Sequence, residues 1–162
     1  MATSKTNAAR LLDSLKISYQ LKPYQLDEQD LSAEHIAELN HFPVEALFKT
    51  LVLRGDKTGV LVACLPGNRE VILKSLASAS GNKKVEMVPQ KEVQGLTGYI
   101  RGGVSPIGMK KNHPVYLDSS ALKHPLIMIN AGHKGILMEI APDGLIRAVN
   151  AQVISLAAEP VS

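Results

Sequence analysis

Two apolar runs separated by a short polar turn constrain the fold of this chain more than any other feature of its sequence. The runs cover residues 48–53 and 59–65, and the connector between them, 54–58, is rich in turn-forming residues. Apolar runs of this length with such a connector are typical of two β-strands that pair as a hairpin. Because both runs are so apolar, at least one face of the hairpin must be buried, and the rest of the chain has to cover it.

Helical and extended patterns are mixed irregularly around this hairpin. The spacing of apolar residues, the N-cap candidates and the prolines predict helices, in chain order, over 6–15 (capped by Thr6 or Asn7), over 32–39 (capped by Ser32), after Pro43, over 71–79, and from Pro89 to near Gly95. Alternating or compact apolar segments predict strands at 19–21, 84–88, 115–117, 126–129 and 136–140. Residues 131–135 are expected to form a tight loop, and 142–144 a turn into a last helix or strand. This irregular order predicts an α+β fold and not a regular βαβ winding.

Length and terminal patterns favour a single soluble domain. The 162 residues are enough for one compact domain, which we expect to span 1–162. No stretch reaches the roughly 18 unbroken apolar residues of a membrane span. The N-terminus leads straight into an amphipathic pattern without the apolar segment of a signal peptide. We therefore expect a cytoplasmic protein that does not bind membranes.

Composition excludes several classes of function. Cys64 is the only cysteine, which rules out an internal disulfide framework and a multi-cysteine zinc site. The five histidines lack the i, i+4 spacing of a metal-binding pair, so no metal site is expected. Aromatic residues make up only 4%, which disfavours a stacking platform for single-stranded nucleic acid. The net charge of +3 permits a polyanionic partner without requiring one.

Lys49 is the first candidate for chemistry, because it lies inside the first apolar run. Burying an ammonium group costs several kcal/mol unless the group is paired or faces a cavity. One interpretation is an edge-strand lysine that points to water and protects the sheet edge. The other is a cation at the wall of a pocket, in contact with an anionic or carbonyl group of a ligand.

Two glycine-containing segments are the next candidates. Residues 98–108 hold four glycines and Pro106, and residues 130–135 follow an apolar strand. Glycine lets the backbone approach a ligand and expose its amide donors, so either segment is able to cradle a phosphate or polarise a carbonyl. The alternatives are a structural Ω-loop for the first and an ordinary hairpin turn for the second. Neither matches a P-loop or a dinucleotide-binding fingerprint.

Other reactive side chains give weaker signals. Cys64 ends an apolar run and is interpreted as a buried hydrophobic residue, and no serine lies in a Gly-x-Ser-x-Gly motif. The pairs 83–84 and 110–111 are lysines, which are either solvated charges or, if the ligand is a nucleic acid, phosphate contacts.

The order of these motifs is more specific than any one of them. Phe-Lys-Thr-Leu, Leu-Lys-x-Leu-Ala, Lys-Lys-Val-Glu-Met, Thr-Gly-Tyr-x-x-Gly-Gly-x-Ser-Pro-x-Gly and a final glycine–lysine–glycine loop occur at 48–51, 73–77, 83–87, 97–108 and 131–135. This order resembles the YbaK/EbsC family, and the resemblance extends from about Thr6 to Leu156.

The resemblance implies a fold and an activity. Members of the family are stand-alone proteins related to the editing domain of bacterial prolyl-tRNA synthetases, with a partly open β-barrel and flanking helices. They break the ester of mischarged aminoacyl-tRNA, and the type member removes cysteine from tRNA(Pro). There the thiol of the substrate is thought to attack the ester carbonyl and release a cyclic product. The resemblance implies no cofactor and no metal. It also implies the acceptor end of an aminoacyl-tRNA and prolyl-tRNA synthetase as partners.

The resemblance also assigns roles to residues of this chain. Lys49 falls on the lysine that is essential in the family and is expected to contact the 3′-terminal adenosine or its phosphate and to position the ester. Thr50 follows it as in the family. Tyr24 matches a tyrosine on the wall of the substrate pocket, and Arg69 a basic residue at its mouth. Gly102 matches the glycine whose backbone approaches the aminoacyl carbonyl.

The remaining substrate-binding candidates belong to the two glycine-containing segments: Gly103, Ser105, Asn130 and Gly132. We expect the backbone amides of Gly102 and Gly103 to stabilise the carbonyl oxygen as negative charge develops on it.

Two positions depart from the family pattern. Asn130 stands where the cysteine-specific members have serine, and Leu137 where they often have aspartate. The amide keeps a polar group in the pocket, but leucine removes a carboxylate. Small changes in a pocket wall shift the preference between near-isosteric substrates, so another small amino acid is an alternative substrate. A non-catalytic module that binds tRNA or the synthetase is an alternative from a different class.

Overall fold

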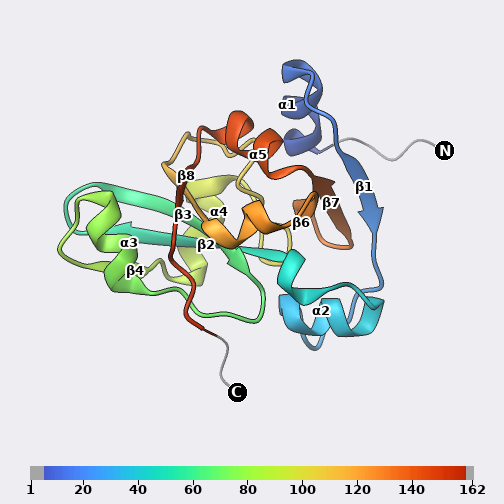
Figure 1. The fold of residues 1–162 in the computed structure, drawn as a ribbon, viewed down its shortest axis with the longest axis horizontal. Helices are drawn as coiled ribbons and strands as arrows, with labels where there is room; N and C mark the ends of the chain where they lie inside the picture. The colour runs from blue at the N-terminus through green and yellow to red at the C-terminus, as the bar shows by residue number, and fades with distance from the viewer. Residues whose placement is uncertain (1–5, 160–162) are drawn as a thin grey trace.

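The structure, a computed structural model, describes residues 6–159 and arranges them as two β-sheets surrounded by helices (Figure 1). The strands are β1 (Gln20–Pro23), β2 (Phe48–Gly55), β3 (Gly59–Pro66), β4 (Val85–Met87), β5 (Val115–Asp118), β6 (Ile127–His133), β7 (Ile136–Ile140) and β8 (Gln152–Ile154). The α-helices are α1 (Asn7–Leu15), α2 (Ala33–Asn40), α3 (Leu73–Ser80), α4 (Gln90–Thr97) and α5 (Pro142–Val149), with short 3₁₀ helices at Val44–Ala46 and Ser119–Lys123. None of the described helices is long and apolar enough to cross a membrane.

The hairpin predicted from the two apolar runs forms the centre of the larger sheet. Strands β2 and β3 pair antiparallel, and the five strands follow the order β4-β2-β3-β5-β8. At the tip, the side-chain oxygen of Asn82 accepts hydrogen bonds from the backbone amides of Lys57 and Thr58, at 2.8 and 2.9 Å. The turn is therefore held to the segment that follows α3.

Helix boundaries follow local capping chemistry. The side chains of Thr6 and Ser32 accept hydrogen bonds from the backbone at the starts of α1 and α2, as predicted. Helix α4 extends beyond Gly95, where we expected it to end, because Gly98 supplies the left-handed cap with a φ of +83°. Gly95 is an interior helical residue with open space around its Cα.

Two segments in the last third of the chain differ from the expectation. The predicted tight loop at 131–135 is too long: β6 continues through a bulge to His133, and only Lys134 and Gly135 form the turn into β7. After α5, the chain forms an additional strand, β8, which pairs parallel with β5. Three residues are too short to produce a periodic pattern, so the pairing with β5 decides that they form a strand.

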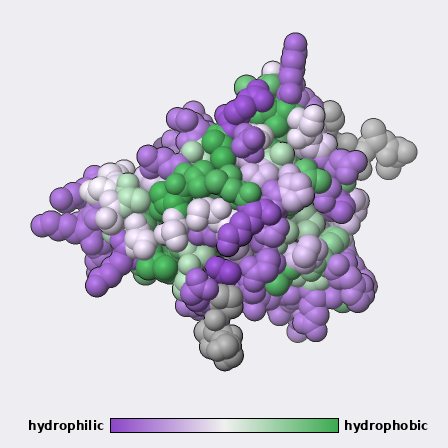
Figure 2. All heavy atoms as spheres, in the orientation of Figure 1, coloured by the Kyte–Doolittle hydropathy of each residue, from purple (hydrophilic) through white to green (hydrophobic). Residues whose placement is uncertain are grey.

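The two sheets meet at one end without closing into a barrel. Leu47, just before β2, forms a parallel bridge with Met128 of β6. The largest core cluster packs between the sheets and includes Leu12 of α1, Ile129 of β6 and Leu145 of α5. The predicted α+β class with a partly open barrel is confirmed. The surface outside this core is largely hydrophilic on the face shown in Figure 2, and its most extended apolar area lies near the middle.

Candidate active site

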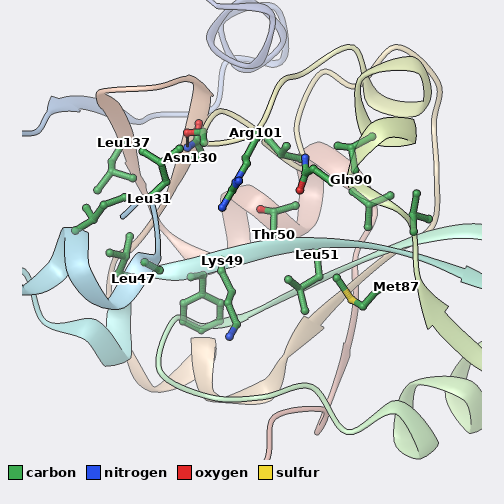
Figure 3. A pocket seen from close by; sticks show the side chains of 18 residues that line it. Leu31, Leu47, Lys49, Thr50, Leu51, Met87, Gln90, Arg101, Asn130 and Leu137 are labelled. Carbon is green, nitrogen blue, oxygen red and sulfur yellow. Dashed lines mark hydrogen bonds between the residues drawn. The ribbon is translucent and has the colours of Figure 1, made fainter. Parts of the chain in front are cut away.

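The first half of β2 lies beside two adjoining hollows. The one bordered by Asn130 and Leu137, here called the inner hollow, has a volume of about 220 Å³. The one bordered by residues 28–34, here called the outer hollow, has a volume of about 520 Å³. Lys49 and Thr50 of β2 line both hollows, and so do Arg101 and Gly102 of the glycine-rich loop. Figure 3 shows Lys49, Thr50 and Arg101 around the smaller of the two. The tertiary structure therefore brings two sequence-predicted site residues, Lys49 and Gly102, to the same place from distant parts of the chain.

The inner hollow is apolar with a few polar groups. Its apolar wall comes from α2, β2, β4, α4 and β7 and from the segments beside them, through Leu31, Ile36, Leu47, Met87, Val88, Val93 and Leu137, among others. Its polar residues are Lys49, Thr50, Gln90, Arg101 and Asn130. Within residues 6–159, no Asp, Glu, His or Cys lines this hollow. It therefore offers neither a carboxylate nor an imidazole as a general base.

Lys49 is a pocket residue and not a solvent-directed edge lysine. It is half-buried, and its Nζ donates a hydrogen bond to the carbonyl oxygen of Gly67 at 3.4 Å. Burial lowers the pKa of the Lys49 ammonium below its ordinary value, and the negative charges of Glu34 and Glu70 oppose this shift. Figure 3 shows Lys49 extending from β2 on the side opposite to Arg101.

Thr50 lies next to the only cysteine. It is opposite Cys64 in the pairing of β2 with β3, and its hydroxyl oxygen is buried. Cys64 is fully buried, and this burial raises the pKa of its thiol to about 12, with the Thr50 hydroxyl opposing the shift. The thiol is therefore protonated at neutral pH and inaccessible, as expected for a core residue.

A tight turn presents the glycine-rich loop to the hollows. The amide of Gly103 donates to the carbonyl of Ile100 at 2.8 Å, which closes a β-turn with Arg101 and Gly102 at its centre. Gly102 has a φ of +84°, and a Cβ there would lie 2.7 Å from the Cγ atom of Lys134. The turn therefore requires glycine at its third position. Of the two amides expected to face a carbonyl oxygen, that of Gly103 is already used inside the turn, and that of Gly102 has no hydrogen-bond acceptor among residues 6–159.

Asn130 joins the turn to β6. Its side-chain nitrogen donates to the carbonyl of Gly102, and its side-chain oxygen accepts from the amide of Gly132 at 2.9 Å. Asn130 lines the inner hollow, whereas Gly132 lies behind it. Asn130, at the start of the bulge in β6, thus both borders the inner hollow and holds the turn that contains Gly102.

Like Gly103 and Gly132, three other sequence-predicted residues do not line the two hollows. Tyr24 packs in the cluster behind the cavity wall. Arg69 forms an ion pair of 3.6 Å with Glu45. Ser105 is fully buried, and its hydroxyl accepts from the amide of Ile107 at 3.2 Å. These side chains support the walls and the loop and do not face the cavity.

Several lining residues escaped the sequence analysis. Arg101 lies within the glycine motif and Met87 within the motif at 83–87, but neither carries a chemical signal of its own, and Gln90 carries no local signal. Of the lysine pairs, neither 83–84 nor 110–111 borders these hollows, and Lys111 lines a separate one beside α5. In the part of the chain that the structure describes, no group of three or more His, Cys, Asp or Glu is placed to hold a metal ion.

Comparisons with known proteins identify relatives of this chain. A proposed Cys-tRNA(Pro)/Cys-tRNA(Cys) deacylase of Enterococcus faecalis, EbsC, is 47% identical over 148 residues, which are 91% of this chain and 90% of that protein. A proline–tRNA ligase of Sulfurihydrogenibium is 31% identical over 103 residues, 64% of this chain but only 18% of the ligase.

Two solved structures share the fold. A hypothetical protein superposes with a TM-score of 0.85 at 23% identity, covering 94% of this chain and 100% of that one. A proposed trans-editing enzyme for prolyl-tRNA synthetase superposes with a TM-score of 0.78 at 24% identity, covering 97% of this chain and 100% of that one. The aminoacyl-tRNA editing domain family matches residues 27–148. The chain therefore belongs to the aminoacyl-tRNA editing domain family.

Proposed function

We propose that the protein acts as one editing domain that removes cysteine from mischarged tRNA(Pro) in trans. The observation that carries this proposal is the meeting of Lys49 and Gly102 at the same two hollows. The name of the Enterococcus faecalis relative supports the substrate, since that protein matches this chain over most of its length. The acceptor end of the tRNA is then the direct partner, and the enzyme would act in the cytoplasm. Prolyl-tRNA synthetase is a further proposed partner.

The two hollows suit the two parts of such a substrate. The inner hollow, at about 220 Å³ and with apolar walls, has room for a small amino acid. The outer hollow, at about 520 Å³, is larger and would take the terminal nucleotide beside its two cations, Lys49 and Arg101. Lys49, Thr50 and Gly102 border both, so the ester bond between the two parts would lie beside them.

The chemistry that fits this lining uses a nucleophile from the substrate. The cysteinyl sulfur forms a bond to its own carbonyl carbon, the bond from that carbon to the ribose oxygen breaks, and the thiol proton ends on the ribose hydroxyl. The amide of Gly102, which has no acceptor among residues 6–159, would donate a hydrogen bond to the carbonyl oxygen, which gains negative charge in the transition state. Lys49 would hold the ribose side of the ester. The lack of a carboxylate or imidazole in the inner hollow within residues 6–159 favours this route over activation of water.

A second candidate activity is removal of another small amino acid. Leu137 is buried in the wall of the inner hollow and presents a methyl surface to it. Such a surface suits an aliphatic side chain such as that of alanine as well as a thiol.

A panel of charged tRNAs tests these proposals. Pure protein is incubated with cysteinyl-, alanyl-, seryl- and prolyl-tRNA(Pro), with and without prolyl-tRNA synthetase, and loss of the ester is followed over time. We expect fast loss of the cysteinyl ester, slow loss of the seryl ester, and no loss with Lys49→Ala. Equal rates for cysteine and serine would refute the substrate-thiol route. Tight tRNA binding without ester loss would refute the enzyme proposal and favour a binding module.

A further inference from the structure

Arg101 is a cation without a counter-ion at the junction of the two hollows. It lines both of them, and within residues 6–159 no carboxylate lies within ion-pair distance of its guanidinium. Other cations nearby are paired: Lys134 with Glu28 at 3.2 Å, and Arg69 with Glu45 at 3.6 Å. In Figure 3, the Arg101 side chain points from its loop toward Thr50 and the space above β2. This guanidinium is therefore free to bind an anion that enters the site.

The backbone that carries Arg101 is held in place before any ligand arrives. Arg101 is the second residue of the turn that the Gly103 amide closes on Ile100. The turn is in addition tied to β6 through the hydrogen bond from Asn130 to the Gly102 carbonyl. A side chain on an anchored turn loses less conformational freedom on binding than one on a mobile loop.

The charges around the outer hollow separate the roles of its two cations. Glu28, Asp30 and Glu34 lie on one side of this hollow. Lys49 is within electrostatic range of Glu34 and Glu70, and its ammonium already donates to a carbonyl. An anion therefore finds a less compensated positive charge at Arg101 than at Lys49. The planar guanidinium also presents a fork of donors that matches phosphate, which an ammonium lacks.

We propose that Arg101 binds the phosphate on the 5′ side of the terminal adenosine, and that Lys49 acts at the ester. This assignment rests on the proposed deacylase function and refines it. It predicts that the two cations affect different kinetic constants: Arg101 contributes to the binding of a phosphate-bearing substrate, and Lys49 to the rate of ester cleavage.

Two substrates separate these roles. Cysteinyl-tRNA(Pro) carries the phosphate, and 3′-O-cysteinyl-adenosine does not. We expect Arg101→Gln to raise KM for the tRNA about tenfold or more, as loss of a charge-assisted hydrogen bond does, with little change in kcat. The variant should cleave the nucleoside ester like the wild type. The salt dependence of its tRNA binding should fall by roughly one counterion. Arg101→Lys should restore only part of the affinity.

A second charge removal, far from the site, serves as the control. Lys57→Gln removes the same charge at the tip of the hairpin, away from both hollows, and should behave as wild type. Equal losses by Arg101→Gln on both substrates, or an unchanged KM for the tRNA, would overturn the assignment. If the wild type cleaves neither ester, the proposed function fails. Binding of uncharged tRNA(Pro), measured by fluorescence anisotropy, then still reports whether Arg101 holds phosphate.

Discussion

At the scale of single residues, the candidate site holds a half-buried ammonium group on Lys49. Lys49 gives up part of its hydration in β2 and gains one hydrogen bond, to Gly67, and a partial offset from Glu34 and Glu70. Because burial lowers the pKa of Lys49, the folded protein releases this proton more readily than the unfolded chain does. Its positive charge therefore reduces stability at neutral pH, and this cost disappears as the pH rises toward the ordinary lysine pKa.

Lys49→Met separates function from stability. The methionine keeps the apolar stem and removes the charge, so we expect deacylation to fall at least about a hundredfold while the free energy of unfolding stays within about 0.5 kcal/mol of wild type or rises. Single-turnover ester cleavage and urea denaturation measure the two effects. Cleavage close to the wild-type rate would contradict the role given to Lys49. A large loss of stability would show that the lysine is a structural residue.

At the scale of elements, the loop from α4 to β5 is shaped by a buried tyrosine and by glycines. The hydroxyl of Tyr99 donates to the carbonyl of Ile107 at 2.7 Å, and its ring packs against Gly132. Burial raises the pKa of Tyr99 to about 12. The loop that carries Arg101 and Gly102 is thus fastened from within, although it contains no strand or helix.

The contribution of the Tyr99 hydroxyl to stability can be tested by comparing Tyr99→Phe with the wild type at several pH values. A pKa raised in the folded state means that the neutral phenol contributes stability below pH 10, the ordinary tyrosine value, and that the contribution is lost as the pH rises from 10 toward 12. We expect the variant to be about 1 kcal/mol less stable at pH 7, and this difference to shrink above pH 10. Denaturant titrations across that range measure it, and a difference independent of pH would argue against a titrating, buried phenol.

A matched pair of glycine substitutions tests the shape of the turn. Gly102→Ala forces a Cβ into a left-handed residue and against Lys134, so we expect a loss of about 1 kcal/mol or more and a strong loss of deacylation. Gly95→Ala adds the same methyl group to the interior of α4, where there is open space, and should stabilise by about 0.5–1 kcal/mol. Thermal melts and ester cleavage of both variants provide the measurement, and equal behaviour would exclude a special role for Gly102.

At the scale of the whole molecule, one buried carboxylate joins the larger sheet to the C-terminal segment. Asp118, at the end of β5, accepts from the amides of Leu156 and Ala157 at 2.9 and 3.0 Å, and from the amide and hydroxyl of Ser120. Burial by itself raises the pKa of Asp118, but these hydrogen bonds outweigh it and keep the pKa below its ordinary value. The segment in turn bonds back to the chain before α3, where Ile72 donates to Leu156.

Removal of this carboxylate should weaken the fold as a whole. In Asp118→Ala, buried amides lose their acceptor, and we expect a loss of about 2–4 kcal/mol at pH 7. Because the pKa is lowered on folding, the wild type holds this contribution above the ordinary Asp pKa and loses it as the pH falls below that value. The gap between the two proteins in denaturant titrations should therefore narrow in acid. A gap that stays constant from pH 7 to pH 3 would contradict the assignment.

Much of the fold and one part of the site follow from local patterns. The hairpin, the caps at Thr6 and Ser32 and the glycine-rich turn depend on residues a few positions apart, and their chemistry is visible in the chain. Strand β8 and the length of β6 depend on pairing partners far away in sequence. Tyr24 and Ser105 have side chains suited to a pocket, and only packing shows that they lie behind its walls.

The sequence by itself determined that Lys49 interrupts an apolar run and that Gly102 lies in a loop rich in glycine, since both properties are visible in neighbouring residues. Only the tertiary structure decided that these two meet, that Asn130 clamps the turn and that Arg101 reaches the same space unpaired. Such meetings result from long-range packing of the two sheets, and no short stretch of sequence contains the distances that packing sets.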